Sequence, residues 1–205
     1  MSHIAILGAT GRAGSRIAAE LLKRGHTVTG VARNVASAPA QPGLTTRSAD
    51  ATSTAALVPL LRGHDAVVST TRFVGGSDAA TLIAAATQAG VPRLLVVGGA
   101  GSLEIAPGKA LVDAPTFPEA YKPEALAGRV FLEALRRETT LDWSFLSPSA
   151  LFEPGERTGV FRLGGDQLLA DAAGVSRISM EDFAIALADE IESPKHSRRR
   201  FTVGY

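Results

Sequence analysis

The sequence contains no cysteine, which excludes disulfide bonds, thiolate metal sites and a cysteine nucleophile. Histidine is scarce too: His3, His26, His64 and His196 lack the spacing of metal ligands, so we expect no metal. No apolar run approaches the ~20 residues needed to cross a bilayer, and strand-like sequence starts at residue 3 without a signal peptide before it. These absences predict a cytoplasmic protein that does not engage a membrane.

Neither sign of charge is in excess. Lys and Arg together number 21 and Asp and Glu 20, for a formal net charge of +1. Because binding to nucleic acid depends on neutralising phosphates with positive charge, this balance predicts no nucleic-acid partner. With 205 residues, 45% of them hydrophobic, the chain is long enough for one sizeable core and short for two. We therefore expect a single domain over residues 1–205.

A glycine-rich turn near the start is the most informative stretch that is present. An apolar run over residues 4–7 leads into Gly8-x-x-Gly11-x-x-Gly14 and then into a predicted helix over 13–24. The glycines allow a sharp turn, close approach of a diphosphate and tight packing of the helix, whose free amides and dipole favour an anion. A second predicted strand over 26–32 completes a βαβ unit within roughly 30 residues. Because the spacing differs from Gly-x-Gly-x-x-Gly, an ordinary strand-to-helix turn is the alternative interpretation.

The rest of the chain alternates between apolar runs and amphipathic segments. We predict strands over 44–48, 65–70, 93–97, 141–146 and 200–205, helices over 52–61, 78–89, 118–138 and 180–191, and a loop over 33–43. Such alternation indicates an α/β, Rossmann-like, doubly wound parallel sheet with helices on both faces. Trp143 is expected in the core. Residues 147–205 are expected to supply a substrate-side loop, small appended segments and the terminal helix.

Three pieces of this last part are given separate interpretations. The stretch 147–159 is predicted to be too polar for the core, and the short extended pieces around 160–162 and 167–169 are predicted to pair as an appended hairpin. The basic cluster over 195–200 is expected to be a solvated segment. The helix over 180–191 is expected to pack against the core, with a homodimer contact as an alternative.

The predicted strand ends carry small, polar or charged residues, as expected where a parallel sheet binds its ligand. Beyond the glycine turn these are Arg33, Asn34, Asp50, Ala51, Ser69, Thr70, Thr71, Gly98, Gly99, Ser147 and Pro148. Arg33 is the most informative of them. Enzymes that prefer NAD usually place an acidic residue there, whereas an arginine suits a 2′-phosphate. Arg33, with Arg12 as a second cation, therefore predicts NADP(H) over NAD(H), unless both are merely solvated arginines.

Three motifs together resemble a known family. They are Gly8-Ala9-Thr10-Gly11-Arg12-Ala13-Gly14, the stretch 96–103 and the stretch 146–152. The chain resembles the atypical short-chain dehydrogenase/reductases over nearly its whole length, and within them the NmrA-like and biliverdin reductase B/flavin reductase-like group of NAD(P)-binding NADH-flavin reductases. The resemblance implies a Rossmann fold with cofactor contacts at Gly8, Thr10, Gly11, Arg12, Ala13, Gly14, Arg33, Asp50, Ala51, residues 69–71, Gly98 and Gly99. It also implies that residues 148–152, including Pro148 and Phe152, lie beside the nicotinamide.

The catalytic pattern departs from the usual one. Short-chain reductases protonate the product with a tyrosine whose pKa is lowered by a lysine four residues later on the same helix face. Here Tyr121 is followed at that distance by Ala125, and Lys122 is its direct neighbour, which faces another way on a helix. Ser102 could hydrogen-bond a substrate oxygen. Ser102, Tyr121 and Lys122 are the candidate catalytic residues, and Tyr121 with Lys122 also fits a surface pair without function.

Two functions remain open from the sequence. The first is an NADP(H)-dependent reductase that passes hydride to a small planar acceptor such as a flavin or quinone, with Phe152 either stacking on that acceptor or packing in the core. The second is a non-catalytic regulator that senses NADP(H), which the missing tyrosine relay favours. A sugar-nucleotide epimerase fits less well, because it too would require the tyrosine and lysine.

Overall fold

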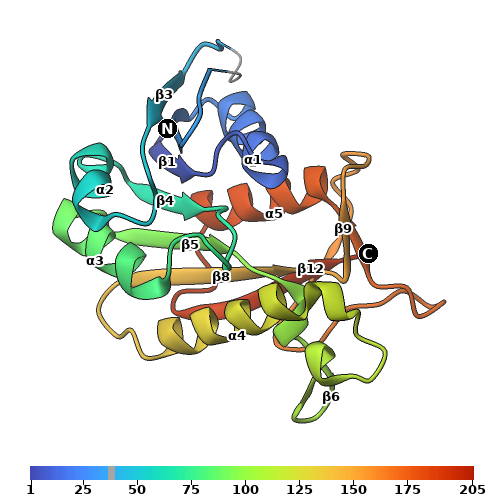
Figure 1. The fold of residues 1–205 in the computed structure, drawn as a ribbon. Helices are drawn as coiled ribbons and strands as arrows, with labels where there is room; N and C mark the ends of the chain where they lie inside the picture. The colour runs from blue at the N-terminus through green and yellow to red at the C-terminus, as the bar shows by residue number, and fades with distance from the viewer. Residues whose placement is uncertain (37–39) are drawn as a thin grey trace.

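The computed structural model describes residues 1–36 and 40–205; residues 37–39, within the predicted 33–43 loop, lie outside the described part. Its centre is an eight-stranded sheet with the order β10-β12-β8-β5-β4-β1-β2-β3 (Figure 1). Seven strands are parallel: β1 (His3–Leu7), β2 (Thr27–Ala32), β3 (Leu44–Ser48), β4 (Ala66–Ser69), β5 (Arg93–Val97), β8 (Asp142–Pro148) and β12 (Arg199–Gly204). The edge strand β10 (Arg162–Gly164) runs antiparallel to β12. The doubly wound, Rossmann-like α/β fold is confirmed.

Helices cover both faces of the sheet. Helices α1 (Arg12–Lys23) and α5 (Met180–Glu192) pack side by side on one face, while α2 (Thr54–Leu61), α3 (Ala79–Ala89) and α4 (Lys122–Arg136) lie on the other (Figure 1). No helix in the described part of the chain is long and apolar enough to cross a membrane.

Helix starts follow from local chemistry. Ser53, Asp78 and Ser179 each accept a hydrogen bond from the amide three residues ahead, which caps α2, α3 and α5. Gly90 ends α3 in the left-handed conformation. Pro59 stays inside α2. The predicted starts of these helices are confirmed to within a residue or two.

The core has two halves, one on each side of the sheet. Alternate residues of a strand face opposite sides, so Ile4 and Ile6 pack with α1 and α5 while Ala5 and Leu7 pack with α2, α3 and α4. Every residue of β5 is buried, as in a strand covered on both faces. Trp143 is 2% exposed, which confirms its place in the core.

The second half of the chain corrects several predictions. Ser147 and Ser149 are fully buried, because β8 runs on to Pro148 and the hydroxyl of Ser149 donates to the Val203 carbonyl; the prediction that 147–159 lies wholly outside the core was wrong. The pieces around 160–162 and 167–169 do not form a hairpin, since β10 pairs with β12 and Gln167 bridges to Glu104. Four short strands were not predicted: β6 (Glu104–Ala106), β7 (Lys109–Ala110), β9 (Leu151–Glu153) and β11 (Arg177–Ser179).

The basic cluster at 195–200 is not simply solvated. Arg200 is 8% exposed and pairs with Asp166, and its guanidinium also donates to Ser102. A strand of the main sheet begins at Arg199, so the cluster lies partly inside the fold.

Candidate nucleotide-binding site

The glycine turn has the geometry that the sequence predicts. Gly8 follows β1 with φ of +84°, a conformation that favours glycine, and its carbonyl accepts from the Gly11 amide at 2.9 Å. A Cβ on Gly14 would collide with that same carbonyl and lie 2.8 Å from Thr70 Oγ1 and 3.0 Å from Ala9 Cα. The turn therefore has room for hydrogen at Gly14 and for nothing larger.

Helix α1 begins at this turn without a side-chain cap. Gly11 occupies the cap position, and the first turn holds no acidic residue, unlike that of α5. In the described residues the amides of Arg12, Ala13 and Gly14 have no acceptor, whereas the next amide, that of Ser15, donates to Gly11 O at 3.0 Å. Free amides at the positive end of a helix dipole bind an anion well. The residues present therefore fit a diphosphate.

The end of β4 braces this turn from the neighbouring strand. The Thr70 hydroxyl donates to the carbonyls of Leu7 and Gly8, at 2.9 and 3.0 Å. The hydroxyls of Ser69 and Thr71 lie 3.1 Å apart, and Ser69 is buried. Strand order reverses between β1 and β4, so the turn lies at the switch point where ligands of such sheets bind.

The end of β2 presents the predicted cation. Arg33 is exposed, and its guanidinium makes no hydrogen bond or ion pair with residues 1–36 or 40–205. Asn34 turns its side chain to the Ala36 amide, so it serves the local loop. The pKa of Asp50 lies below its usual value, chiefly through the Thr52 amide and hydroxyl and to a smaller extent through the charge of Arg33. Arg33 and Asp50 thus lie near each other at this edge.

The remaining residues predicted to contact the cofactor differ in their contacts and in their exposure. Gly98 donates to Leu146 O and packs on the Phe145 ring, whereas a Cβ on Gly99 would meet open space. The ring of Phe152 packs against that of Phe183 with centroids 4.8 Å apart, so its core interpretation is confirmed. Thr10 is exposed at the tip of the turn, Ala13 packs on the core, Ala51 accepts from Ser77, and Pro148 is buried at the end of β8.

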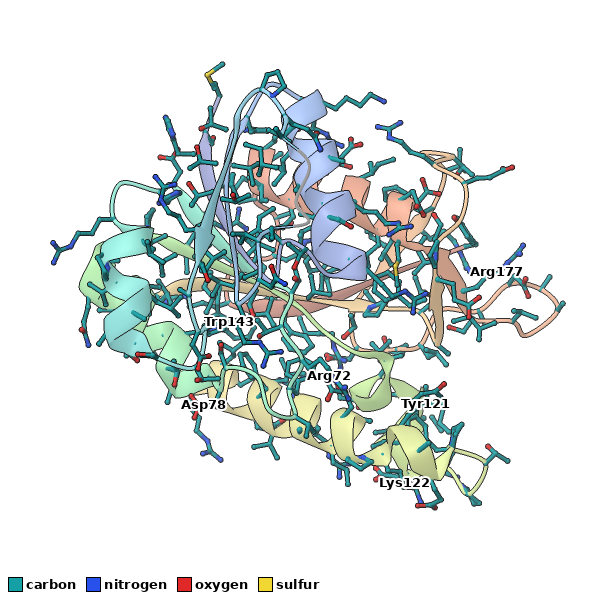
Figure 2. The ribbon with its side chains drawn as sticks, turned by 45° about the horizontal axis from the view of Figure 1, so that its top comes forward. Arg72, Asp78, Tyr121, Lys122, Trp143 and Arg177 are labelled. Atoms are coloured by element: carbon teal, nitrogen blue, oxygen red, sulfur yellow. The ribbon has the colours of Figure 1, made fainter. Side chains whose placement is uncertain are left out.

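The candidate catalytic residues lie around the start of α4. Tyr121 is 66% exposed in the short 3₁₀ helix Glu119–Tyr121, and Lys122 pairs with Glu119; both lie at the N-terminal end of α4 (Figure 2). Ser102 ends another 3₁₀ helix, Ala100–Ser102, which packs closely on Ala125 through Gly101. The structure therefore brings their elements together, and no Tyr–Lys pair of the usual kind forms.

Two residues close to these strand ends, Gly30 and Arg72, were not singled out from the sequence. A Cβ on Gly30 in β2 would lie 2.9 Å from the Cβ of Ala9, so this glycine lets the turn pack against its neighbouring strand. A glycine inside a strand is the signal that could have found it. Arg72, just after β4, is 78% exposed and holds Glu124 only loosely, at 3.6 Å (Figure 2). Its position after the predicted strand end 69–71 was the available signal.

Comparison with known proteins shows the family to which the chain belongs. A family model described as NAD(P)H-binding matches residues 8–191. The chain belongs to this NAD(P)H-binding family. The match begins at the first glycine of the turn and runs almost to the end of α5, so it includes the turn and all five α-helices of the described chain.

Solved structures of similar proteins agree with this family. A protein of Burkholderia pseudomallei described as a "putative exported protein" is 46% identical, with TM-score 0.91 and full coverage of both chains. A "putative epimerase" from Bacteroides thetaiotaomicron is 41% identical, with TM-score 0.93 and coverage of 100% of this chain and 97% of the other. A "putative NADH-flavin reductase" from Streptococcus pneumoniae is 36% identical, with TM-score 0.85 and coverage of 100% and 99%.

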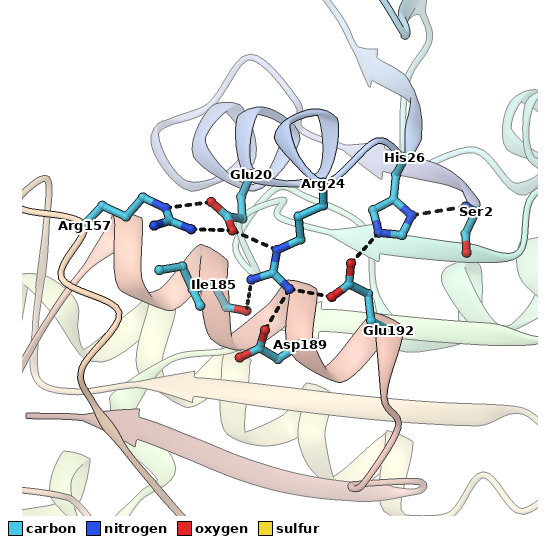
Figure 3. A network of polar contacts seen from close by, with 8 residues as sticks. All are labelled: Ser2, Glu20, Arg24, His26, Arg157, Ile185, Asp189 and Glu192. Atoms are coloured by element: carbon cyan, nitrogen blue, oxygen red, sulfur yellow. Dashed lines mark hydrogen bonds and ion pairs between the residues drawn. The ribbon is translucent and has the colours of Figure 1, made fainter.

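Beside the glycine turn, a charged network fastens the 154–160 segment to helices α1 and α5 (Figure 3). Arg157 holds Glu20 of α1 through two bonds of 2.9 Å, and Arg24 holds the same carboxylate at 2.8 Å. Arg24 also reaches Asp189 and Glu192 of α5, each at 2.7 Å. The Arg157 contact, together with Arg24 and against the effect of burial, lowers the pKa of Glu20 to about 2.

This network predicts how stability depends on pH. Glu20→Gln is expected to lower the free energy of unfolding at pH 7 by about 2 kcal/mol, because two arginines lose their shared carboxylate. The pKa of Glu20 is lower in the folded state than the ordinary 4.5, so its contribution is complete above pH ~4.5 and is lost as pH falls toward 2. Urea unfolding of both proteins at pH 7 and pH 3 measures this. The difference should shrink at the lower pH.

The control is Glu133→Gln, which removes an exposed partner of Arg136 on α4. That pair should contribute less than ~1 kcal/mol at any pH, as exposed pairs do. Equal effects of the two substitutions, or a Glu20 effect that grows on acidification, would contradict the assignment.

Proposed function

We propose that the protein is an NADPH-dependent reductase that transfers hydride to a small planar acceptor such as a flavin or quinone. The observation that carries the proposal is the uncapped start of α1, with three free amides facing a turn that only glycine fits. Membership of the NAD(P)H-binding family supports it, as does similarity to a "putative NADH-flavin reductase". NADPH when bound supplies the hydride.

The chain's own residues bind and orient the nucleotide. Amides of residues 12–14 hold the diphosphate. Arg33 holds the 2′-phosphate, with Arg12 as a second cation. Thr70 fixes the shape of the turn through the Leu7 and Gly8 carbonyls. Gly99 leaves open space at the end of β5. A hydride acceptor with its own ring nitrogens or carbonyls needs less help from a protein acid than a simple ketone does.

Turnover is tested with purified protein, NADPH and a panel of flavins, quinones and small carbonyls, by following loss of nicotinamide absorbance. We expect oxidation with planar acceptors and little with simple carbonyls. Tight binding of NADPH without oxidation across the panel would contradict the reductase and favour a regulator that senses NADP(H).

The part played by Tyr121 is tested in the same assay. Tyr121→Phe is expected to change kcat by less than about twofold, whereas loss of a general acid typically costs ~100-fold or more. The reason is that the side chain is 66% exposed and Lys122 is paired with Glu119. Ser102→Ala is the companion variant, because Ser102 belongs to the 3₁₀ helix that packs on the first turn of α4 and its hydroxyl contacts Arg200. A hundredfold loss in Tyr121→Phe would instead make Tyr121 the proton donor.

The cellular location and partners belong to the same proposal. A reductase of this kind needs a compartment that regenerates NADPH, which supports the cytoplasm as its location and a small molecule as its partner. Fractionation of cells followed by immunoblotting tests the location. A homodimer stays a prediction, which light scattering can measure.

A further inference from the structure

A cavity of about 670 Å³ lies at the outer face of the small sheet formed by β9 and β11. Its wall includes Leu151, Glu153, Val160, Arg177 and Tyr205, and the 154–160 segment closes one side. Small-molecule sites commonly measure ~300–1,000 Å³, so the space suits a ring system of two or three fused rings. None of the residues predicted from the sequence to contact the cofactor lines it.

The alternation of side chains along β9 places Phe152 on the opposite face of the strand from the cavity. Phe152 turns inward onto Phe183, and successive strand residues point to opposite faces. Leu151 and Glu153 therefore point outward, into the cavity. Leu151 is 53% exposed and Val160, which also lines the cavity, is 76% exposed. Two apolar side chains left open to solvent in one cavity favour an apolar ligand.

The charged residues of the cavity lining determine which apolar ligands fit. The Arg177 guanidinium lies 5.7 Å from the centre of the Tyr205 ring and makes no hydrogen bond or ion pair within the described residues. It can donate to a ring carbonyl. Glu153 and Glu156 also line the wall and form no ion pair in residues 1–36 and 40–205, so the lining carries more negative than positive charge. An uncharged ring with carbonyl oxygens fits this wall better than a phosphorylated one.

The cavity is held open by bonds that need no ligand. Arg157 is fixed to Glu20, the Gly155 amide donates to Glu181 at 2.7 Å, and the Gly159 amide donates to the fully buried Asp182 at 2.8 Å. The Tyr205 hydroxyl lies 2.8 Å from an Asp182 oxygen, which sets the angle of its ring. A site formed in advance loses little entropy on binding.

The same bonds connect the cavity to the nucleotide turn. Glu181 accepts from Gly155 with one oxygen and from Arg16 with the other, and Arg16 donates to the Arg12 carbonyl at 2.9 Å, at the start of α1. Leu151 follows Pro148, the last residue of β8, by three positions. The cavity thus lies at the carboxyl edge of the sheet, where ligands of such folds bind.

We infer that this cavity receives the acceptor, and that it selects an uncharged, flat ring bearing carbonyl groups. That the ligand of this cavity is a hydride acceptor rests on the proposed reductase function. Binding of the ligand does not depend on turnover. The sequence predicts that the acceptor lies beside Ser102 and Phe152. The cavity instead places it against Leu151, Val160, Arg177 and Tyr205.

Quenching of riboflavin fluorescence by the full chain, without nucleotide, tests the assignment. We expect riboflavin to bind more tightly than its 5′-phosphate, because Glu153 and Glu156 repel the phosphate. Val160→Asp should weaken riboflavin binding by at least tenfold and raise the acceptor KM, while leaving the Kd for NADPH unchanged. Arg177→Met should weaken riboflavin severalfold. Val130→Asp, at a position 69% exposed on α4, is the matched control and should change nothing.

The outcomes separate this inference from the proposed function. NADPH oxidation that Val160→Asp and Arg177→Met leave untouched, or tighter binding of the phosphorylated flavin, would overturn the cavity assignment and keep the reductase. Riboflavin binding that both variants weaken, with no oxidation of NADPH by any acceptor, would keep the cavity as a ligand site and overturn the reductase. Absence of riboflavin binding to the natural chain would overturn the cavity assignment.

Discussion

Gly14→Ala is expected to weaken NADPH binding at least ~100-fold, equivalent to about 2.7 kcal/mol. The added methyl group would collide with the Gly8 carbonyl and lie 2.8 Å from Thr70 Oγ1, so the turn must open or α1 must shift. Either movement takes the free amides of residues 12–14 out of position. Isothermal titration calorimetry with NADPH measures the loss, and circular dichroism checks that the variant remains folded.

Two further variants make this result interpretable. Gly165→Ala adds a methyl group where nothing lies within 4 Å, and it should bind NADPH normally. Thr70→Val keeps the shape of the side chain but removes the hydroxyl that holds the Leu7 and Gly8 carbonyls, and it should weaken binding about tenfold, or ~1.4 kcal/mol. Normal affinity in Gly14→Ala would mean that the diphosphate does not bind at this turn.

Arg33→Ala is expected to weaken NADPH by ~10–100-fold and to leave NADH within about twofold, since a hydrogen bond between charged groups contributes ~1.5–3 kcal/mol. The guanidinium is exposed and has no partner in the described part of the chain, so its removal leaves no buried group unpaired. Calorimetry with each nucleotide gives the ratio of the two affinities.

Arg47→Ala provides the comparison for Arg33. Arg47 is also exposed, on β3, and among residues 1–36 and 40–205 its guanidinium donates only to the Thr46 carbonyl next to it. Its loss should affect both nucleotides alike and by little. An unchanged preference in Arg33→Ala would show that Arg33 is a solvated arginine and would remove the argument for NADPH over NADH.

The sequence predicted the parts of this molecule that depend on local chemistry. Most of the seven parallel strands coincide with apolar runs. The predicted starts of α2, α3 and α5 agree with the structure because a cap such as that of Ser53, Asp78 or Ser179 needs only the next three residues. The glycine turn was predictable for the same reason. Its spacing reflects contacts between residues a few positions apart, such as that between the Gly8 carbonyl and the Gly11 amide.

The parts that the sequence did not predict depend on distant contacts. Arg157 and Glu20 are 137 positions apart, and Arg200 meets Asp166 and Ser102 only after β12 has joined the sheet. A polar stretch such as 147–159 looks like a surface loop because the Val203 carbonyl, which accepts from the buried Ser149 hydroxyl, comes from elsewhere in the chain. The same limit hid the cavity, which forms between segments that are separate in sequence.

The most direct test follows the backbone amides of the isotopically labelled protein by NMR during titration with NADPH. If the diphosphate sits on the start of α1, the resonances of Arg12, Ala13 and Gly14 should shift more than those of the capped starts of α2 and α3. Saturation of the protein with NADPH while these three resonances stay in place would contradict the account.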